Sequence, residues 1–204
     1  MILRDKGGLW SPVISLVDHD GRPAVLKDYR TKNALTRSLL APVLVRREAE
    51  VLRHLDGVAG IPKLYAVEPL ALVTQFVDGQ HPGRIEKLPD DAFRRLAATV
   101  RAMHDRGVVH LDLRQKKNIL VDREMRPWLV DFANAMIVGP RSPLRPLFEK
   151  LRAIDDGALV KFKARYWPRL LTDADRGAMK RQHLLRKLWP FSPHTDRPKD
   201  LTWK

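Results

Sequence analysis

Short apolar runs, each broken by a turn signal, characterise the N-terminal part of the chain. Val13 to Val17 and Ala24 to Lys27 flank D-H-D-G-R-P, in which Asp20-Gly21 is a strong hairpin signal. Two further runs, K-L-Y-A-V-E-P and L-A-L-V-T-Q-F-V-D-G, predict a second pair of strands that ends at Asp78-Gly79. The pattern therefore predicts a small antiparallel sheet.

Two longer stretches have apolar residues at helical spacing. The first opens near Pro42, a residue type favoured in a first helical turn, and ends near Gly57. The second begins at Pro89 or Asp90 and ends at Gly107. Their apolar faces are formed by Val45, Ala49, Leu52 and Leu55 in the first helix and by Phe93, Leu96, Val100 and Met103 in the second.

A third predicted hairpin has polar side chains at both outer ends. Its apolar strands run from Ile119 to Val121 and from Trp128 to Val130, and a hairpin brings its outer ends together. We therefore expect Asp112, Asn118 and Asp131 to converge. Two carboxylates and a carboxamide suit Mg²⁺, which usually binds one or two carboxylates, several waters and the phosphates of a substrate. This site predicts a ligand that carries phosphate.

The same stretch resembles the protein-kinase superfamily. H-L-D-L-R-Q-K-K-N and D-F-A stand where kinases have H-R-D-x-x-x-x-N and D-F-G. The resemblance implies ATP and Mg²⁺ as cofactors, with Asp112 accepting the proton of the attacking hydroxyl. It also implies that Asn118 and Asp131 hold the metal and that His110 is part of the scaffold.

An upstream lysine fits the same resemblance. Lys27 closes A-V-L-K, which is similar to the kinase sequence V-A-I-K, so Lys27 would bind the α- and β-phosphates while a carboxylate steadies its side chain. A solvated residue at a strand end is the alternative. Either Glu48 or Glu50 could be the partner, and the alignment of R-E-A-E-V-L-R-H-L with the kinase pattern favours Glu48.

Two further nucleotide contacts are implied by the resemblance. K-G-G-L-W-S-P-V takes the place of the glycine-rich loop, with Gly8 and Ser11 on its second and third glycines, although Pro12 removes a backbone donor. An ordinary β-turn is the alternative here. The backbone from Gln75 to Val77 would face adenine at a hinge, and an ordinary strand and turn is the alternative.

The catalytic loop departs from the family at three positions. Asn118 lies six residues after Asp112 where the motif has five, so the loop must bulge by one residue. Leu111 replaces the arginine that pairs with a phosphorylated activation loop in many protein kinases, which argues against that form of control. Ala133 replaces the glycine of D-F-G and restricts the backbone. The departures fit either an enzyme held in one active-like arrangement or a non-catalytic relative.

Arg114 lies two residues beyond Asp112, where serine/threonine kinases place a lysine. By that resemblance its guanidinium would neutralise the transferring γ-phosphate. The alternative is a surface arginine that forms a basic rim with Lys116 and Lys117.

The composition of the chain limits the kinds of partner that it is expected to bind. The chain has 204 residues, within the range of one domain or two small lobes, and 38 Lys and Arg against 24 Asp and Glu give a formal charge of +14. This surplus predicts an anionic partner and argues against the cationic acceptors of the aminoglycoside kinases. The absence of cysteine excludes disulfides and thiolate metal sites. Without a signal-peptide pattern or a long apolar run, we expect a cytoplasmic protein, at most peripheral to the inner membrane.

Much of the basic surplus lies in residues 140–204, with sixteen Lys and Arg against seven Asp and Glu. Leu147, Leu151 and Ile154 predict an apolar helical face, and Thr172-Asp173 predicts the cap of a helix that runs toward Leu188. Three interpretations stay open: a helix pair with a solvated basic face, phosphate contacts with RNA, or an anchor on anionic lipid. The anchor would use the aromatic residues Trp189, Phe191 and Trp203.

Together these features predict a bilobal α+β protein-kinase-like fold. The N-lobe would span residues 1–78 with a small antiparallel sheet, and a truncated, mainly helical C-lobe would span 79–204, with a hinge near 76–82. The resemblance covers roughly residues 7–137 and is closest to RIO-like serine/threonine kinases and to bacterial lipopolysaccharide core kinases.

We therefore expect an ATP-Mg²⁺-dependent phosphotransferase of the small serine/threonine-kinase type. Its acceptor would be a hydroxyl of a protein, or alternatively of a Kdo or heptose sugar of lipopolysaccharide. A nucleotide-binding scaffold without transferase activity is a second class. A basic module that binds RNA or a membrane, with an accidental kinase resemblance, is a third.

Overall fold

The computed structural model describes residues 2–4, 11–139, 142–143 and 145–179. The chain divides into two compact units, Met1–Leu170 and Leu171–Lys204, and all strands and long helices of the described residues lie in the first. The predicted boundary between an N-lobe and a C-lobe, after residue 78, therefore falls inside the first unit.

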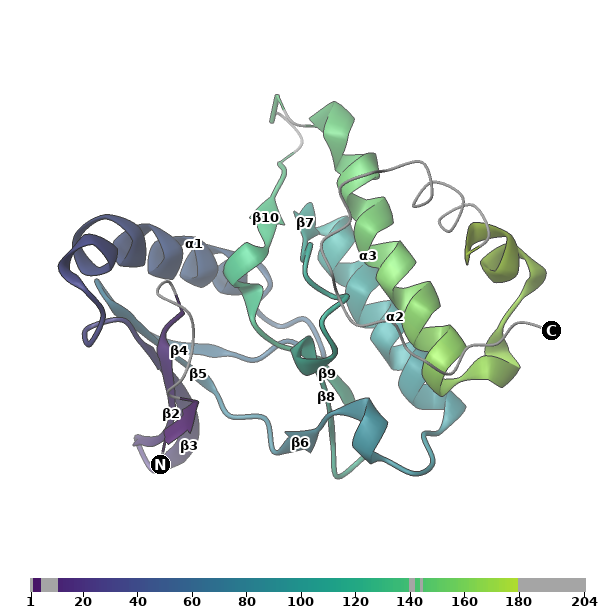
Figure 1. The fold of residues 1–204 in the computed structure, drawn as a ribbon, viewed down its shortest axis with the longest axis horizontal. Coiled ribbons are helices and arrows are strands. Elements are labelled where there is room, and N and C mark those ends of the chain that lie inside the picture. Colours follow the sequence, from purple (N-terminus) through teal and green to yellow (C-terminus); the bar gives the residue numbers. More distant parts are fainter. Residues whose placement is uncertain (1, 5–10, 140–141, 144, 180–204) are drawn as a thin grey trace. The chain divides into compact units, whose positions relative to one another are not determined.

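A five-stranded antiparallel sheet forms the N-terminal part of this unit (Figure 1). The hairpin at Asp20 and Gly21 is confirmed, and both residues have positive φ, 53° and 75°, as a two-residue hairpin turn of type I′ requires. A strand that the sequence pattern missed precedes the predicted glycine-rich loop and pairs with the first predicted strand. The sheet order is β1 (Ile2–Arg4), β2 (Val13–His19), β3 (Arg22–Asp28), β5 (Ala71–Gln75) and β4 (Leu64–Glu68).

Helix α1 (Ala41–His54) packs on β4 and β5 (Figure 1). Pro42 lies in its first turn, as predicted, but helical backbone continues upstream through the π-helix Thr36–Leu40. The true N-terminal cap is Asn33, whose Oδ1 accepts the backbone N–H of Thr36 at 2.8 Å.

The C-terminal part contains two long helices that lie side by side, α2 (Asp90–Asp105) and α3 (Arg145–Tyr166) (Figure 1). Helix α2 ends at Asp105, two residues before the predicted Gly107, which follows the C-cap Arg106. Gly107 has a φ of 73°, and an added Cβ would lie only 2.7 Å from the carbonyl oxygen of Val138. Two small antiparallel sheets complete this part: β6 (Gly79–Gln80), β8 (Ile119–Asp122) and β9 (Pro127–Leu129) in one, and β7 (Val108–Val109) with β10 (Met136–Ile137) in the other.

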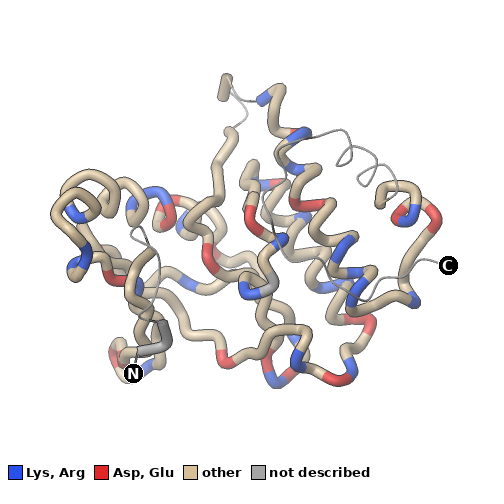
Figure 2. The backbone as a smooth tube through the Cα atoms, in the orientation of Figure 1, with Lys and Arg blue, Asp and Glu red and all other residues tan. Residues whose placement is uncertain are grey.

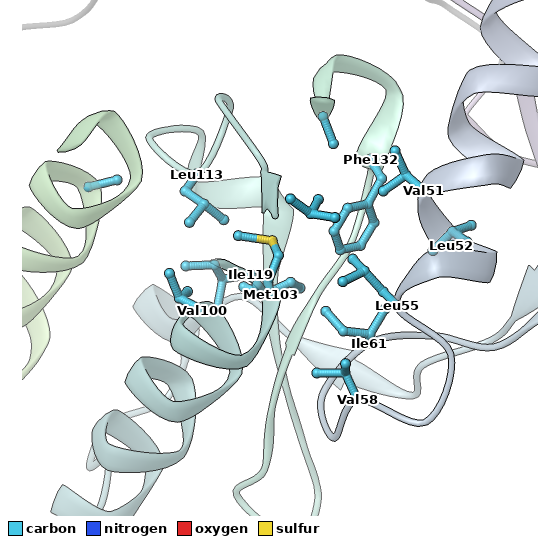
Figure 3. Packing of buried hydrophobic residues seen from close by; sticks show 14 of the residues in the cluster. Val51, Leu52, Leu55, Val58, Ile61, Val100, Met103, Leu113, Ile119 and Phe132 are labelled. Carbon is cyan, nitrogen blue, oxygen red and sulfur yellow. The ribbon is translucent and has the colours of Figure 1, made fainter. Parts of the chain in front are cut away.

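One hydrophobic core joins the two parts (Figure 3). Val51 and Leu55 of α1 pack in the same cluster as Met103 of α2 and Ile119 of β8, and the buried ring of Phe132 belongs to it too. Because Phe132 directly follows Asp131, core packing fixes the backbone beside this predicted site residue.

The predicted apolar face of α3 is buried only in part. Leu151 packs against the apolar cluster of Val109, Val138 and Phe148, whereas Leu147 and Ile154 are 41% and 38% exposed. The fully buried face of α3 begins one residue further along and includes a carboxylate. That carboxylate has hydrogen-bond partners from other elements, a tertiary contact that helical periodicity does not report. The buried residues are Phe148, Asp155, Gly157, Ala158 and Phe162.

In the second unit, helical backbone begins at Asp173, as predicted. Thr172 and Asp175 form a reciprocal cap: Thr172 Oγ1 accepts the Asp175 N–H at 3.2 Å, and Asp175 Oδ2 accepts the Thr172 N–H at 2.8 Å. The predicted end near Leu188 and the aromatic residues Trp189, Phe191 and Trp203 lie outside the described residues. Within the described ranges, no helix has the length and apolarity needed to span a membrane.

Candidate active site

A buried lysine lies between two carboxylates from distant parts of the chain. Lys27 Nζ of β3 donates to Glu48 Oε1 of α1 at 2.6 Å and to Asp131 Oδ1 at 3.0 Å. The side chains of Lys27 and Glu48 are 9% and 3% exposed, and that of Asp131 is 29% exposed. The structure therefore selects Glu48 as the partner, and Glu50 is exposed on the same helix.

The charges of this trio stabilise one another. Burial alone would lower the pKa of Lys27, but the charges of Glu48 and Asp131 outweigh burial and raise the pKa above its ordinary value. Burial likewise raises the pKa of Asp131, but the charge and hydrogen bond of Lys27 hold it below the ordinary range. Both groups are thus ionised at neutral pH.

Helix α1 also forms hydrogen bonds to the loop that carries Asp131. Glu48 Oε1 accepts the backbone N–H of Phe132 at 3.2 Å, and Arg47 donates to the carbonyl oxygens of Ala135 at 3.0 Å and Asn134 at 3.3 Å. Arg47 was not predicted. These bonds place the carboxylate of Asp131 relative to α1.

Two consecutive turns accommodate the one extra residue between Asp112 and Asn118 in the catalytic loop. Gln115 N–H donates to the Asp112 carbonyl at 3.2 Å, and Asn118 N–H donates to the Gln115 carbonyl at 3.0 Å, closing a 3₁₀ turn over Lys116–Asn118. Asn118 Nδ2 then reaches back to Asp112 Oδ2 at 3.0 Å. Both side chains thus meet, as the predicted bulge requires.

The carboxamide group of Asn118 has a free hydrogen-bond acceptor, its oxygen Oδ1. Its Nδ2 is committed to Asp112, whereas its Oδ1 is buried and has no hydrogen-bond partner in the described structure. Asn134, from the loop after Asp131, places its Nδ2 3.5 Å from Asp112 Oδ2, so the two loops approach each other at Asp112. A buried oxygen without a donor is a suitable place for a cation.

Two residues near the site have left-handed backbone. Asp131 and Leu111 have φ of 67° and 65°, a region that non-glycine residues rarely adopt and that costs about 1–3 kcal/mol. At Leu111 the compensation is visible, since Asp155 Oδ1 of α3 accepts the backbone N–H of Leu111 at 2.9 Å. The side chain of Leu111 packs against an apolar cluster that includes Val109.

Asp155 is the structural residue that the sequence pattern missed. It is fully buried, and its Oδ2 accepts the backbone N–H of His110 at 2.7 Å and lies 3.1 Å from His104 Nε2. His110 is scaffold, as expected: its Nε2 donates to the Val130 carbonyl at 3.2 Å, and burial lowers its pKa, so its ring is neutral. A lone Asp among apolar residues on one helical face was the available signal.

Two basic residues of the catalytic loop, Arg114 and Lys117, are exposed. Arg114 is exposed and, among the described residues, forms no hydrogen bond or ion pair. Lys117 lies close enough to Asp131 for its charge to lower the pKa of that carboxyl group. Lys117, which the sequence analysis placed in a basic rim with Arg114 and Lys116, thus brings a positive charge near this carboxylate in addition to that of Lys27.

The remaining predicted contacts are described in part. Gly8 lies outside the described residues, and Ser11 is half-buried just before β2. The N–H of Gln75 donates to the Lys63 carbonyl at 2.8 Å, and the Val77 carbonyl accepts from Gly79 at 2.9 Å, so these two backbone groups are already paired.

A surface hollow of about 200 Å³ lies beside the predicted hinge, but its lining includes neither Lys27 nor Asp131. Among the described residues, no three His, Cys, Asp or Glu side chains gather as a ready metal site. A cation between Asn118 and Asp131 would therefore depend on water and phosphate oxygens for its other ligands, as Mg²⁺ commonly does.

Comparison with known proteins agrees with this geometry. The model of the RIO domain family matches residues 19–152, which include the lysine, both carboxylates and the catalytic loop. The chain belongs to the RIO domain family. This membership confirms the predicted relation to the small RIO-like branch of the kinase superfamily.

Solved structures confirm the fold of this RIO domain. It matches a Rio2 kinase-ADP/Mg²⁺-phosphoaspartate complex from Chaetomium thermophilum with a TM-score of 0.60 and 19% identity, over 86% of this chain and 59% of that one. A second Rio2 kinase structure from this organism matches with a TM-score of 0.57 and 19% identity, over 77% of this chain and 54% of that one. The bilobal α+β kinase-like fold is thus confirmed.

A curated relative is similar over a shorter stretch. "Serine/threonine-protein kinase D" of Synechocystis sp. is 28% identical over 109 residues, which are 49% of this chain and 22% of that protein. The RIO domain described here thus spans about a fifth of that relative and less than two thirds of either Rio2 chain.

Proposed function

We propose that this RIO domain binds ATP with Mg²⁺ and transfers the γ-phosphate to a serine or threonine hydroxyl of a protein. The observation that carries the proposal is the pairing of Lys27 with Glu48 and Asp131. In the neighbouring catalytic loop, the carboxamide groups of Asn118 and Asn134 approach the carboxylate of Asp112. Phosphoryl transfer needs mainly positioned charge, and this arrangement supplies it.

Lys27 is suited to phosphate binding because one of its two carboxylate partners can be replaced by phosphate oxygens while the other keeps the ammonium group in place. Glu48 is buried and holds the ammonium group from α1. Asp131 is the more exposed partner, so its bond to Lys27 is the one that phosphate oxygens would replace. Lys27 would then neutralise the α- and β-phosphates, which is the role of the corresponding lysine in the kinases that this chain resembles.

The residues present also fit a divalent ion. Asn118 Oδ1 is buried without a donor, and Asp131 would be free to turn from Lys27 toward a cation, so these two side chains would hold it. A Mg²⁺ ion held there would supply positive charge that neutralises the phosphates of the nucleotide.

Asp112 would accept the proton of the attacking hydroxyl. Its Oδ2 accepts hydrogen bonds from the carboxamide groups of Asn118 and Asn134, which orient the carboxylate. Arg114 and Lys117 are proposed to contact the γ-phosphate, Gly8 and Ser11 to lie over the phosphates, and Gln75 and Val77 to lie beside adenine.

The acceptor is proposed from the relatives. Rio2 and the Synechocystis protein carry the name kinase, the latter serine/threonine-protein kinase, and neither is named a lipopolysaccharide kinase. A protein hydroxyl is therefore the favoured acceptor, and a Kdo or heptose hydroxyl is an outcome that the test must separate.

The test follows γ-labelled ATP. Wild-type protein is incubated with Mg²⁺ and with either a protein fraction or purified lipopolysaccharide, beside Asp112→Asn and the exposed control Asp105→Asn. We expect label on protein with the wild type and the control, and none with Asp112→Asn, while all three still bind ATP. Label on lipopolysaccharide would reassign the acceptor, and ATP binding without any transfer by the wild type would identify a scaffold.

A further inference from the structure

An apolar strip is exposed where the helix that carries Glu48 begins. Leu35, Leu39 and Val43 are 57%, 63% and 62% exposed, the three highest values among the large apolar side chains of the described residues. They recur every four residues along continuous helical backbone, so they lie along one side of the helix. This side of the helix is not used to pack the sheet.

The surroundings of this apolar strip are basic. Between Thr31 and Arg47 the chain has no Asp or Glu (Figure 2). Lys32, Arg37 and Arg46 lie in this interval, and none of them pairs with a carboxylate among the described residues. The segment therefore presents aliphatic side chains together with uncompensated positive charge.

We propose that this strip is a docking surface for an anionic lipid membrane. The three aliphatic side chains would enter the boundary between headgroups and acyl chains, and cations on the same side of the helix, such as Arg46 three residues after Val43, would lie among the lipid phosphates. This is the arrangement of helices that lie in the plane of a membrane surface. The proposal does not depend on phosphotransfer, and it concerns a segment other than the basic residues near the C-terminus.

The chemistry favours a membrane over a protein occupant. A specific protein interface covers about 800 Å² on each partner, whereas this strip offers only three aliphatic side chains beside cations. A second copy of the chain would bring two sets of cations together without an acid from this segment, which disfavours self-association.

A single fluorophore tests the contact in the full chain. The protein has no native cysteine, so Leu39→Cys can be labelled with an environment-sensitive dye at one site, and Ile154→Cys on α3, also exposed, serves as the matched control. We expect a blue shift of the dye at residue 39 with phosphatidylglycerol-containing vesicles, weakened by salt, and none with phosphatidylcholine alone or at residue 154. The absence of that shift, or a shift that grows with protein concentration without lipid, would overturn the proposal.

Co-sedimentation of unlabelled protein with the same vesicles separates this strip from the C-terminal segment. The triple change Leu35→Ser, Leu39→Ser, Val43→Ser alters only exposed side chains, so the fold is expected to persist, as circular dichroism would verify. The vesicle partition coefficient should fall about ten-fold or more. The control change Leu147→Ser should leave it unaltered. If the triple variant binds like the wild type, the membrane contact lies elsewhere and the proposal fails.

Discussion

Removal of the Glu48 carboxylate should weaken the fold and abolish phosphotransfer together. Glu48 Oε1 accepts from Lys27 Nζ at 2.6 Å and from the Phe132 N–H at 3.2 Å, so Glu48→Ala leaves a buried ammonium group and a backbone donor short of a partner. The neighbouring Glu50 is exposed, and Glu50→Ala on the same helix is the matched control.

The magnitude follows from burial. Lys27 and Glu48 side chains are 9% and 3% exposed, so solvent screens their interaction little. Truncation of one partner of a buried ion pair costs about 3–5 kcal/mol. The remaining bond between Lys27 and Asp131 places the expected loss at the lower end, about 3 kcal/mol. For a domain of this length that corresponds to a fall in Tm of about 6–12 °C.

Urea denaturation followed by circular dichroism measures the loss of unfolding free energy, and γ-labelled ATP measures transfer. Glu48→Ala should lose about 3 kcal/mol. Glu50→Ala should stay within about 0.5 kcal/mol of the wild type and keep its activity. Equal effects of the two changes, or full activity in Glu48→Ala, would show that the ion pair does not organise the site.

Three further changes probe the scaffold of the site. Arg47→Ala should lower the free energy of unfolding in urea by about 1 kcal/mol, since it removes hydrogen bonds from a charged but exposed donor. The control Arg46→Ala should change the free energy little. Equal losses would show that the bonds of Arg47 do not stabilise the loop that carries Asp131. Asp155→Asn should cost about 3–5 kcal/mol, because buried donors of His110, Leu111 and His104 lose a charged acceptor, and a loss below about 1 kcal/mol would contradict that role. Burial lowers the pKa of His110, so below its ordinary value of 6.5 the unfolded chain takes up a proton that the folded chain does not. Wild-type stability should therefore fall from pH 7 to pH 5 more steeply than that of His110→Gln, and parallel curves would refute this assignment.

Local pattern was sufficient for the elements that hold the site. Alternating strands with an Asp20-Gly21 turn, and the helical periodicity that ends at Gly107, fix those elements within a few residues, and the structure confirms them. The choice of Glu48 over Glu50 came from motif register, and it holds because α1 turns residue 48 toward Lys27.

The rest depends on contacts between distant residues. Asp155 is buried because backbone N–H groups some forty-five residues away need an acceptor, and the predicted face with Leu147 and Ile154 could not anticipate this. The proximity of Lys117 to Asp131 follows from the path of the 3₁₀ turn, which sequence spacing does not define. The positive φ of Asp131 has no sequence signal at all.

The central claim is that Lys27, Glu48, Asp112, Asn118 and Asp131 form one site for a nucleotide and its metal. Calorimetric titration of ATP, with and without Mg²⁺, into the wild type and Asp131→Asn tests it most directly. We expect Mg²⁺ to strengthen ATP binding to the wild type, and we expect this gain to be lost in Asp131→Asn. Absence of ATP binding to the wild type, or an equal gain from Mg²⁺ in the variant, would contradict it.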